Sequence, residues 1–240
     1  MTPYAALLDR IRRDPAAPLL TYRDLASGER MELSAVSLGN AIAKTAGLLR
    51  DELDASPGDV IGIHLPAHWQ RVVWFGACAA TGTVFAPDAA PEECDVLVMD
   101  RAHLGLEGTT RESVLVSLAP FGLPDGDEVP IGVIEAAVAM RGHPDAFTPW
   151  ETPTDSTPLL RIDGRHLTHG EVMEHASGEL ARRGVERGER FALIAPDPHT
   201  DILGLAGPLS IGGAAVILAH PESGDVGTTL REEGVTPGGG

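Results

Sequence analysis

The chain contains an internal repeat, in which residues 33–87 and 167–221 carry the same landmarks at the same spacing. In each copy a Gly-acid pair precedes an apolar stretch, a Pro stands eight residues after the Gly, and a second Gly stands sixteen residues after the Pro. Two copies are too few for a solenoid, so the repeat predicts two similar α/β units. The landmarks are Gly58-Asp59, Pro66 and Gly82 in the first copy and Gly188-Glu189, Pro196 and Gly212 in the second.

Strand-like and helix-like hydrophobic patterns alternate along the chain. Short, continuously apolar runs indicate buried strands, and longer runs with a 3.6-residue period indicate amphipathic helices. This alternation predicts mostly parallel sheets with helices on both faces. Strands are expected at residues 19–22, 30–33, 60–65, 83–86, 96–99, 114–118, 159–162, 166–167, 190–195 and 214–219, and helices at residues 4–13, 34–53, 68–81, 131–140, 168–183 and 200–210.

Segment 142–158 is rich in Pro, Gly, Asp and Thr, a composition typical of loops, and it marks the expected boundary between the units. We therefore expect a first α/β unit over residues 1–150, with an N-terminal helix and hairpin, and a second, incomplete α/β unit over residues 151–240. The repeat makes strand 60–65 equivalent to strand 190–195. Both are expected to be central, buried and parallel to their neighbours.

The charge balance restricts the partners of the protein. The formal net charge is −17, which argues against binding to nucleic acid or to anionic membranes. No apolar run reaches the roughly 18 residues of a membrane helix, and the first residues lack the basic and apolar regions of a signal peptide. We therefore expect a cytoplasmic protein, in which Cys78 and Cys94 are buried thiols rather than a disulfide.

Five segments carry a more specific signal. They are Pro57–Pro66, Ala79–Asp88, Leu167–His169, Arg187–His199 and Gly213–Leu218. In this order they resemble the N-terminal region of the adenylate-forming superfamily of AMP-binding enzymes, which includes acyl-CoA synthetases, luciferases and the adenylation domains of peptide synthetases. The resemblance implies two related three-layer α/β units with mostly parallel, buried sheets, like the N-terminal part of the large domain of an AMP-binding synthetase.

One family motif is replaced inside the chain. The phosphate loop, Ser/Thr-Ser-Gly-Ser/Thr-Thr-Gly-x-Pro-Lys-Gly in the family, would lie just before Leu167, where this chain has residues 155–166. A phosphate cradle needs successive glycines, whose N–H groups converge on the anion, and a cation. This segment contains one glycine, Gly164, and no lysine. We expect Gly164 to form the turn of a small hairpin instead.

Lysines are almost absent from the chain. Lys44 is the only one, and it falls on a solvent-facing position of its expected helix. The resemblance therefore implies that the lysine of the family's phosphate loop and the lysine of its small C-terminal domain are both missing. The family's later motifs, whose Glu holds magnesium and whose Asp holds the ribose, also have no match. We expect no cofactor, no catalytic residue and no metal ligand.

His199 is the single candidate substrate-binding residue. In the resemblance it matches the histidine of a "Pro-x-x-His" segment that lines the acyl-substrate pocket. The match then fails, because Ile202 stands where the family usually has a Gly. From the residues alone, a histidine that opens a helix after Pro198 is also consistent with a capping or surface role. An acyl pocket, if retained, is expected between the two units, near the carboxyl ends of their strands.

Three further histidines, with two glutamates nearby in the sequence, suggest a metal site. His166, His169 and His175 lie close in sequence to Glu171 and Glu174. However, His169 and His175 are six residues apart on one expected helix, so they do not share a face. We expect no metal there.

These observations predict a non-catalytic, degenerate AMP-binding-synthetase-like protein, which keeps the scaffold and an acyl-ligand pocket. The ligand would be a small carboxylic acid or an acyl thioester. One alternative is an acyl- or aryl-acid:CoA ligase, completed by a partner chain or by a missing C-terminal part. Another is a structural or interaction protein that dimerises. The replaced loop favours the first function, because truncation explains a missing end but not a missing middle.

Overall fold

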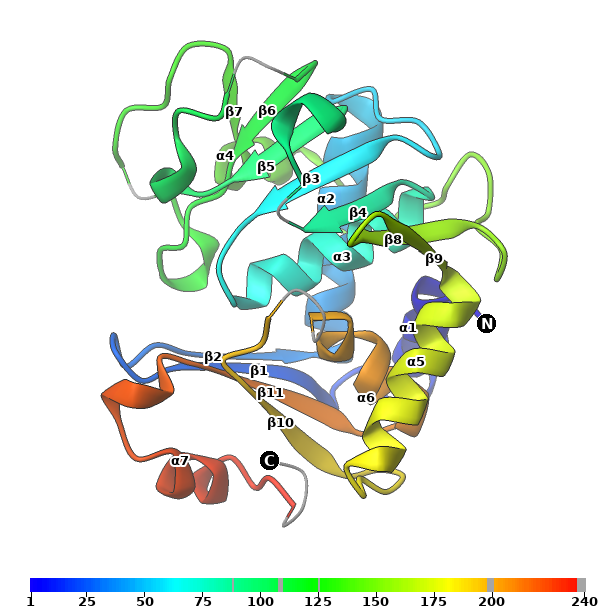
Figure 1. Ribbon diagram of the computed structural model, residues 1–240, viewed down its shortest axis with the longest axis vertical. Coiled ribbons are helices and arrows are strands. Elements are labelled where there is room, and N and C mark those ends of the chain that lie inside the picture. Colours follow the sequence, from blue (N-terminus) through cyan, green and yellow to red (C-terminus); the bar gives the residue numbers. More distant parts are fainter. Residues whose placement is uncertain (88, 108–109, 125, 198–200, 237–240) are drawn as a thin grey trace.

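The protein was analysed as a computed structural model that describes residues 1–87, 89–107, 110–124, 126–197 and 201–236. Within them the chain forms two β-sheets with helices packed around them (Figure 1). The strands are β1 (Pro18–Asp24), β2 (Arg30–Ser34), β3 (Val60–His64), β4 (Val84–Pro87), β5 (Val96–Met99), β6 (Glu112–Leu115), β7 (Val133–Glu135), β8 (Pro158–Ile162), β9 (Arg165–Thr168), β10 (Arg190–Ile194) and β11 (Ala214–Ala219).

Helices connect most of these strands. The α-helices are α1 (Pro3–Arg13), α2 (Ala35–Asp51), α3 (Trp69–Thr81), α4 (Ala136–Ala139), α5 (His169–Arg182), α6 (Ala206–Ile211) and α7 (Val226–Glu232). Short 3-10 turns are η1 (Pro91–Glu93), η2 (Arg101–His103), η3 (Pro120–Gly122), η4 (Met140–Gly142), η5 (Asp201–Gly204) and η6 (Pro221–Ser223). None of the helices in the described ranges is long and apolar enough to cross a membrane.

The strand order confirms the predicted α/β fold with mostly parallel sheets. The larger sheet has seven strands in the order β7-β6-β5-β3-β4-β8-β9, and the smaller has four in the order β10-β11-β1-β2. The hairpin β1–β2 pairs with β11 of the distant C-terminal segment, while the hairpin β8–β9 pairs with β4 of the N-terminal segment. Each sheet therefore contains strands from both halves of the chain, and the two sheets face each other across α3 (Figure 1).

The repeated landmarks form the same turn twice. The Gly58 N–H donates to the Gly82 carbonyl at 2.9 Å, and the Gly188 N–H donates to the Ile211 carbonyl at the same distance. In both copies the acidic residue accepts an N–H from three residues earlier, at 3.0 Å for Asp59 and 2.7 Å for Glu189. The Gly-acid pair thus joins the start of β3 and of β10 to the end of the helix that follows each strand.

Strand β3 has the predicted central position, whereas the prediction for β10 is wrong. β3 lies between β4 and β5 and is parallel to both. β10 is parallel to β11 and largely buried, but it lies at the edge of the smaller sheet. The physical reason is that β3 receives β5 as a second neighbour, while the described chain after β11 continues into α7 and adds no strand beside β10.

Two further local expectations differ from the structure. Segment 131–140 was expected to be helical throughout, but it forms strand β7 and the four-residue helix α4. β7 pairs with β6 in parallel, so the tertiary pairing overrides the helix-like pattern. Helix α7 was not expected from the sequence. Its N-cap is Asp225, whose side chain accepts the Thr228 N–H at 3.0 Å.

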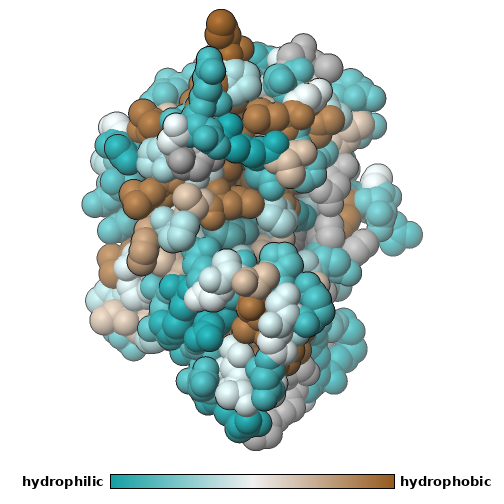
Figure 2. Space-filling model, turned by 90° about the vertical axis from the view of Figure 1, so that its left-hand side faces the viewer, coloured by the Kyte–Doolittle hydropathy of each residue, from teal (hydrophilic) through white to brown (hydrophobic). Residues whose placement is uncertain are grey.

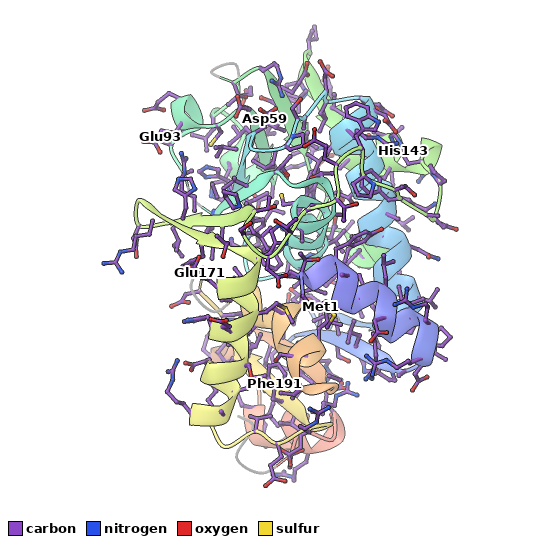
Figure 3. The ribbon with its side chains drawn as sticks, turned by 90° about the vertical axis from the view of Figure 1, so that its right-hand side faces the viewer. Met1, Asp59, Glu93, His143, Glu171 and Phe191 are labelled. Carbon is purple, nitrogen blue, oxygen red and sulfur yellow. The ribbon has the colours of Figure 1, made fainter. Side chains whose placement is uncertain are left out.

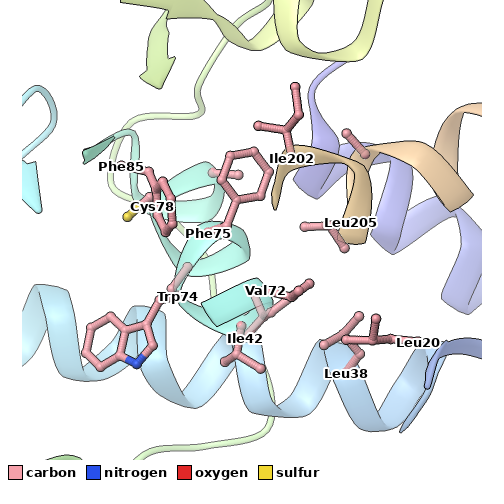
Figure 4. Packing of buried hydrophobic residues seen from close by; sticks show 14 of the residues in the cluster. Leu20, Leu38, Ile42, Val72, Trp74, Phe75, Cys78, Phe85, Ile202 and Leu205 are labelled. Atoms are coloured by element: carbon pink, nitrogen blue, oxygen red, sulfur yellow. The ribbon is translucent and has the colours of Figure 1, made fainter. Parts of the chain in front are cut away.

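The hydrophobic core is centred on α3. Its Phe75 meets Phe85 edge to face with 5.3 Å between ring centroids, and its other faces contact α2 and η5 (Figure 4). Trp69, Trp74 and Cys78 of α3 are all buried, which confirms the burial expected for the Cys78 thiol. Burial raises the pKa of the Cys78 thiol to about 12, so it stays protonated. Cys78 and Cys94 are both free thiols, as expected, but Cys94 is only partly buried, unlike the expectation for it.

Candidate functional site

At the position where the resemblance places a phosphate loop, the chain forms a tight β-hairpin, β8–β9. β8 ends at Ile162 and β9 begins at Arg165, and these two residues are paired in the ladder. Only Asp163 and Gly164 lie between them, with φ angles of 50° and 70°. Two positive φ values are typical of the type I′ turns that close two-residue hairpins. The prediction of a hairpin turn at Gly164 is confirmed, and the described turn is too short to wrap a phosphate.

Helix α5, which follows the hairpin, is capped at its N-terminus by one of its own acidic residues. Thr168 accepts the Glu171 N–H at 3.3 Å, and the Thr168 N–H donates to Glu171 Oε2 at 2.8 Å. This capping box lies directly below the hairpin (Figure 3). Hydrogen bonds from the Thr168 backbone and hydroxyl lower the pKa of Glu171. The anion-favouring end of α5 is therefore occupied by a carboxylate of the chain itself.

The sequence-predicted candidates do not form a common site. His199 lies outside the described residues. His169 is fully buried, whereas His166 and His175 are exposed, so these histidines do not converge. No group of three metal-ligating side chains was found in the part of the chain that the structure describes. Lys44 on α2 is partly exposed, with 34% of its side chain accessible, and it pairs with Asp145 at 3.1 Å.

A cavity of about 450 Å³ lies between the two sheets. It is placed at the ends of β1, β3 and β11, the region in which open α/β sheets bind ligands. Figure 2 shows this face of the molecule, with hydrophobic side chains more frequent over its upper half. The cavity is lined by Tyr22, Asp24, Ser27, Gly28, Glu29, Arg30, Met31, Pro66, Ala67, His68, Leu118, Pro120, Phe121 and His220.

Asp24 organises the hairpin side of the cavity. Its carboxylate accepts the Ala26 N–H and the Ser27 hydroxyl, each at 2.8 Å, and lies 2.8 Å from His220 Nδ1. Burial raises the pKa of Asp24, but the bonds from Ser27, His220 and Ala26 outweigh it, so the net shift is downward. Asp24 is therefore ionised at neutral pH, and its oxygens are already engaged.

His68 forms the opposite wall, at the N-cap of α3. Its ring meets Tyr22 edge to face with 4.6 Å between centroids, and the residue is only 3% exposed. Nδ1 accepts the Gln70 N–H at 3.3 Å, which assigns the proton of the neutral ring to Nε2. Burial lowers the pKa of His68 to about 4, against the opposing charge of Asp24. His68 Nε2 is buried and has no hydrogen-bond partner among the described residues.

Glu29 contributes a second carboxylate to the cavity. Burial raises its pKa, and the negative charge of Asp24 raises it further. Its Oε1 atom is buried without a hydrogen-bond partner in the described residues. A buried carboxylate oxygen and a buried imidazole N–H without partners are both costly in free energy. Sequence reasoning missed these residues, because Glu29 and His68 belong to no motif.

Two of the buried histidines, His68 and His169, should make the protein less stable at acid pH. Burial lowers the pKa of His68 and His169 to about 4, from an ordinary 6.5. The unfolded chain then binds more protons between these values, so stability falls as the pH drops from 6.5 toward 4. We expect a loss of up to about 3 kcal/mol for each histidine.

Chemical denaturation across this pH range checks the effect. His169 has no partner on either ring nitrogen among the described residues, so His169→Leu should preserve stability at neutral pH and remove about half of the acid-side loss. The control is His175→Leu, at an exposed position of the same helix, which should leave the pH dependence unchanged. If the free energy of unfolding falls with pH as steeply in His169→Leu as in the unmodified protein, His169 does not stay neutral in the folded protein.

Comparisons with known proteins place the fold. No protein-family model matches the chain. An acetoacetyl-CoA synthetase from Streptomyces lividans aligns with a TM-score of 0.73 and 18% identity, over 91% of this chain and 38% of that one. An acyl-CoA synthetase from Brucella canis aligns with a TM-score of 0.78 and 18% identity, over 98% of this chain and 46% of that one. The chain therefore has an acyl-CoA synthetase-like fold and spans less than half the length of these two synthetases.

Sequence relatives agree with this fold. The nonribosomal peptide synthetase apvA of Aspergillus terreus is 24% identical over 161 residues, which cover 62% of this chain and 17% of that protein. A TIGR03089 family protein of Mycobacterium tuberculosis is 36% identical over 247 residues, which cover 96% of this chain and 95% of the relative. A likeness of this extent runs through both sheets, including the β8–β9 hairpin. This chain belongs to the TIGR03089 family and has an acyl-CoA synthetase-like fold.

Proposed function

We propose that this protein is a non-catalytic, degenerate relative of the AMP-binding synthetases, which binds a small ligand and does not activate it with ATP. The observation that carries the proposal is the two-residue turn at Asp163-Gly164 between β8 and β9. In the AMP-binding synthetases this position holds the phosphate loop. Here the backbone on both sides of the turn is committed to the β-ladder, so its N–H groups cannot converge on an anion.

The charges around the turn support the same conclusion. The Thr168 N–H at the N-terminus of α5 donates to the carboxylate of Glu171, and this negative charge would repel a phosphate at that end of the helix. The only lysine, Lys44, lies on α2 and pairs with Asp145. Adenylation needs groups that stabilise the charge developing on the transferred phosphate. A partner chain that supplied a second half would still leave this turn in place, which weighs against the ligase alternative.

The proposed ligand site is the cavity between the sheets. Its volume of about 450 Å³ lies within the range of small-molecule pockets. Resemblance to the synthetases suggests a small carboxylic acid or an acyl thioester as the ligand. Whether His199 contacts such a ligand stays a prediction, as do a protein partner, a homodimer and a cytoplasmic location. His199→Ala should weaken a bound acid or thioester by about 1–3 kcal/mol if its imidazole hydrogen-bonds the ligand.

An exchange assay tests the absence of catalysis. The protein is incubated with ATP, magnesium, labelled pyrophosphate and a panel of aliphatic and aromatic carboxylic acids. We expect no acid-dependent incorporation of label into ATP, because no group of the described turn holds the triphosphate. Acid-dependent exchange by the purified chain would contradict the proposal and would favour the acid:CoA ligase.

A further inference from the structure

We propose that Arg23, Arg30 and Arg190 form a binding site for a phosphate group, and that Glu233 at the end of α7 is its internal occupant. A phosphate that displaces the Glu233 carboxylate would release α7 from the smaller sheet. The inference goes beyond the proposed function, because it concerns a second site with its own ligand. Among the described residues, Arg30 alone of the three arginines also lines the cavity between the sheets.

The three arginines come from different strands and converge on one carboxylate. Arg23 lies on β1, Arg30 on β2 and Arg190 on β10. Glu233 Oε1 accepts hydrogen bonds from Arg23 Nη1 and Arg30 Nε, each at 2.9 Å. Glu233 Oε2 accepts from Arg30 Nη2 at 3.0 Å and from Arg190 Nη2 at 3.3 Å. Guanidinium groups arranged in this way suit a phosphate group, because each presents several N–H donors in a fixed plane.

The charges favour a doubly charged anion once Glu233 has left. A second carboxylate contacts two of the arginines, since Glu32 Oε2 lies 2.9 Å from Arg30 and 3.3 Å from Arg190. Without Glu233, three guanidinium groups face this one carboxylate, and a phosphate dianion restores the balance. A single carboxylate ligand would carry no more charge than Glu233, which is tethered to the site and therefore competes at a high effective concentration.

The donors of the site are accessible while α7 is docked. The exposed fraction of the side chain is 21% for Arg23, 20% for Arg190 and 44% for Arg30, whereas it is 3% for Glu233. The buried group is thus the carboxylate that would leave, and the guanidinium groups that would receive the phosphate already contact solvent. A phosphate can approach their outer edges before Glu233 has moved away.

Helix α7 depends on these ion pairs for its place on the sheet. It lies below the smaller sheet, on the side away from α3 (Figure 1). The structure describes all seven of its residues, and Thr229 is the only buried one. A single helix of this length is unstable in water. Glu233 follows its C-terminal end, where a negative charge opposes the helix dipole, so this residue favours the arginines and not the helix.

Phosphate binding to Glu233→Ala tests the site. Titration calorimetry at constant ionic strength compares this variant with the unmodified protein and with Glu232→Ala, which removes the exposed neighbouring carboxylate. We expect Glu233→Ala to bind inorganic phosphate at least about tenfold more tightly than the other two proteins, because the internal competitor is gone. In the unmodified protein Glu233 fills the site, which agrees with the expected failure to hold ATP. Equal affinities of the three proteins, or no binding to Glu233→Ala, would overturn the inference.

Hydrogen exchange in the unmodified protein gives a second test, which does not require a stable Glu233→Ala variant. Phosphate at about 100 mM should speed exchange of the α7 amides at least about tenfold relative to chloride at the same ionic strength, because phosphate binding raises the population with α7 released. The amides of β3, inside the larger sheet, should not respond. Equal effects of the two salts would mean that phosphate only screens the ion pairs, and the proposed site would be wrong.

Arginine variants locate the phosphate. In the Glu233→Ala background, Arg23→Gln should weaken phosphate binding at least about tenfold, because one of the three cations is lost. Arg187→Gln removes an exposed arginine that precedes β10 and should leave the affinity unchanged. An unchanged affinity in the Arg23→Gln variant would place the phosphate elsewhere and contradict the proposal. Methyl phosphate distinguishes an esterified phosphate from the free ion, because the tighter binder of the two is the better model of the ligand, and either order supports the site.

Discussion

Replacing Glu233 by alanine should lower the free energy of unfolding by about 2–4 kcal/mol. The Glu233 side chain is only 3% exposed and holds three arginines of the smaller sheet. Its oxygens lie 2.9 Å from Arg23 and Arg30 and 3.3 Å from Arg190. Removing the carboxylate leaves these guanidinium groups facing one another and detaches the end of α7 from β1, β2 and β10.

Urea denaturation measures the change, and Glu232→Ala is the control. Glu232 is the neighbouring residue and is exposed, so its replacement should cost little. Burial raises the pKa of Glu233, but Arg30 and Arg23 lower it more, to below 4.5. The stability contributed by Glu233 should therefore be complete above pH 4.5 and be lost as the pH falls through the lower folded value. Equal stabilities of the two variants would show that the arginines do not depend on Glu233.

Gly213→Ala should be similarly costly, at about 2–4 kcal/mol, because the new side chain meets backbone rather than a movable side chain. A Cβ atom at Gly213 would lie 2.0 Å from the carbonyl oxygen of Glu189. That oxygen cannot easily retreat, since it accepts the Ala214 N–H at 3.1 Å at the start of β11. The substitution should therefore push the Gly188-Glu189 turn away from the start of β11.

The matched change is Gly178→Ala on α5. A Cβ atom at Gly178 meets nothing within 4 Å, so alanine should raise stability by about 0.5–1 kcal/mol through its higher helix propensity. Thermal or urea unfolding of both variants gives the comparison. A Gly213→Ala protein as stable as the unmodified chain would show that the close approach at Glu189 is not fixed in solution.

Local features of the fold were predictable from the sequence. The repeated spacing around Gly58 and Gly188 led us to expect two similar units, and in both copies the Gly N–H donates to a carbonyl at the end of the following helix, that of Gly82 or of Ile211. Gly164 was predicted as a hairpin turn because a lone glycine after an apolar run suits a positive φ, as observed. The hairpin prediction succeeds because neighbouring residues determine such turns.

Features that depend on distant pairing were not predictable. Strand β10 carries the same pattern as β3, but its edge position depends on which strands pair beside it. The cavity could not be predicted from the sequence either. It depends on the contact of His68, at the start of α3, with Tyr22, and this contact forms only where the β1–β2 hairpin pairs with β11. No single segment of the sequence encodes the contact between His68 and Tyr22. A histidine that directly precedes a helix was the available signal, and a capping role accounts for it equally well.

A calorimetric titration of the protein with ATP-Mg tests most directly whether a chain with the tight turn at Asp163-Gly164 holds a triphosphate. The replaced loop and the pairing of Lys44 with Asp145 predict a dissociation constant weaker than about 1 mM, or about −4.1 kcal/mol. A dissociation constant near or below about 100 μM, roughly −5.5 kcal/mol, would contradict the loss of ATP binding.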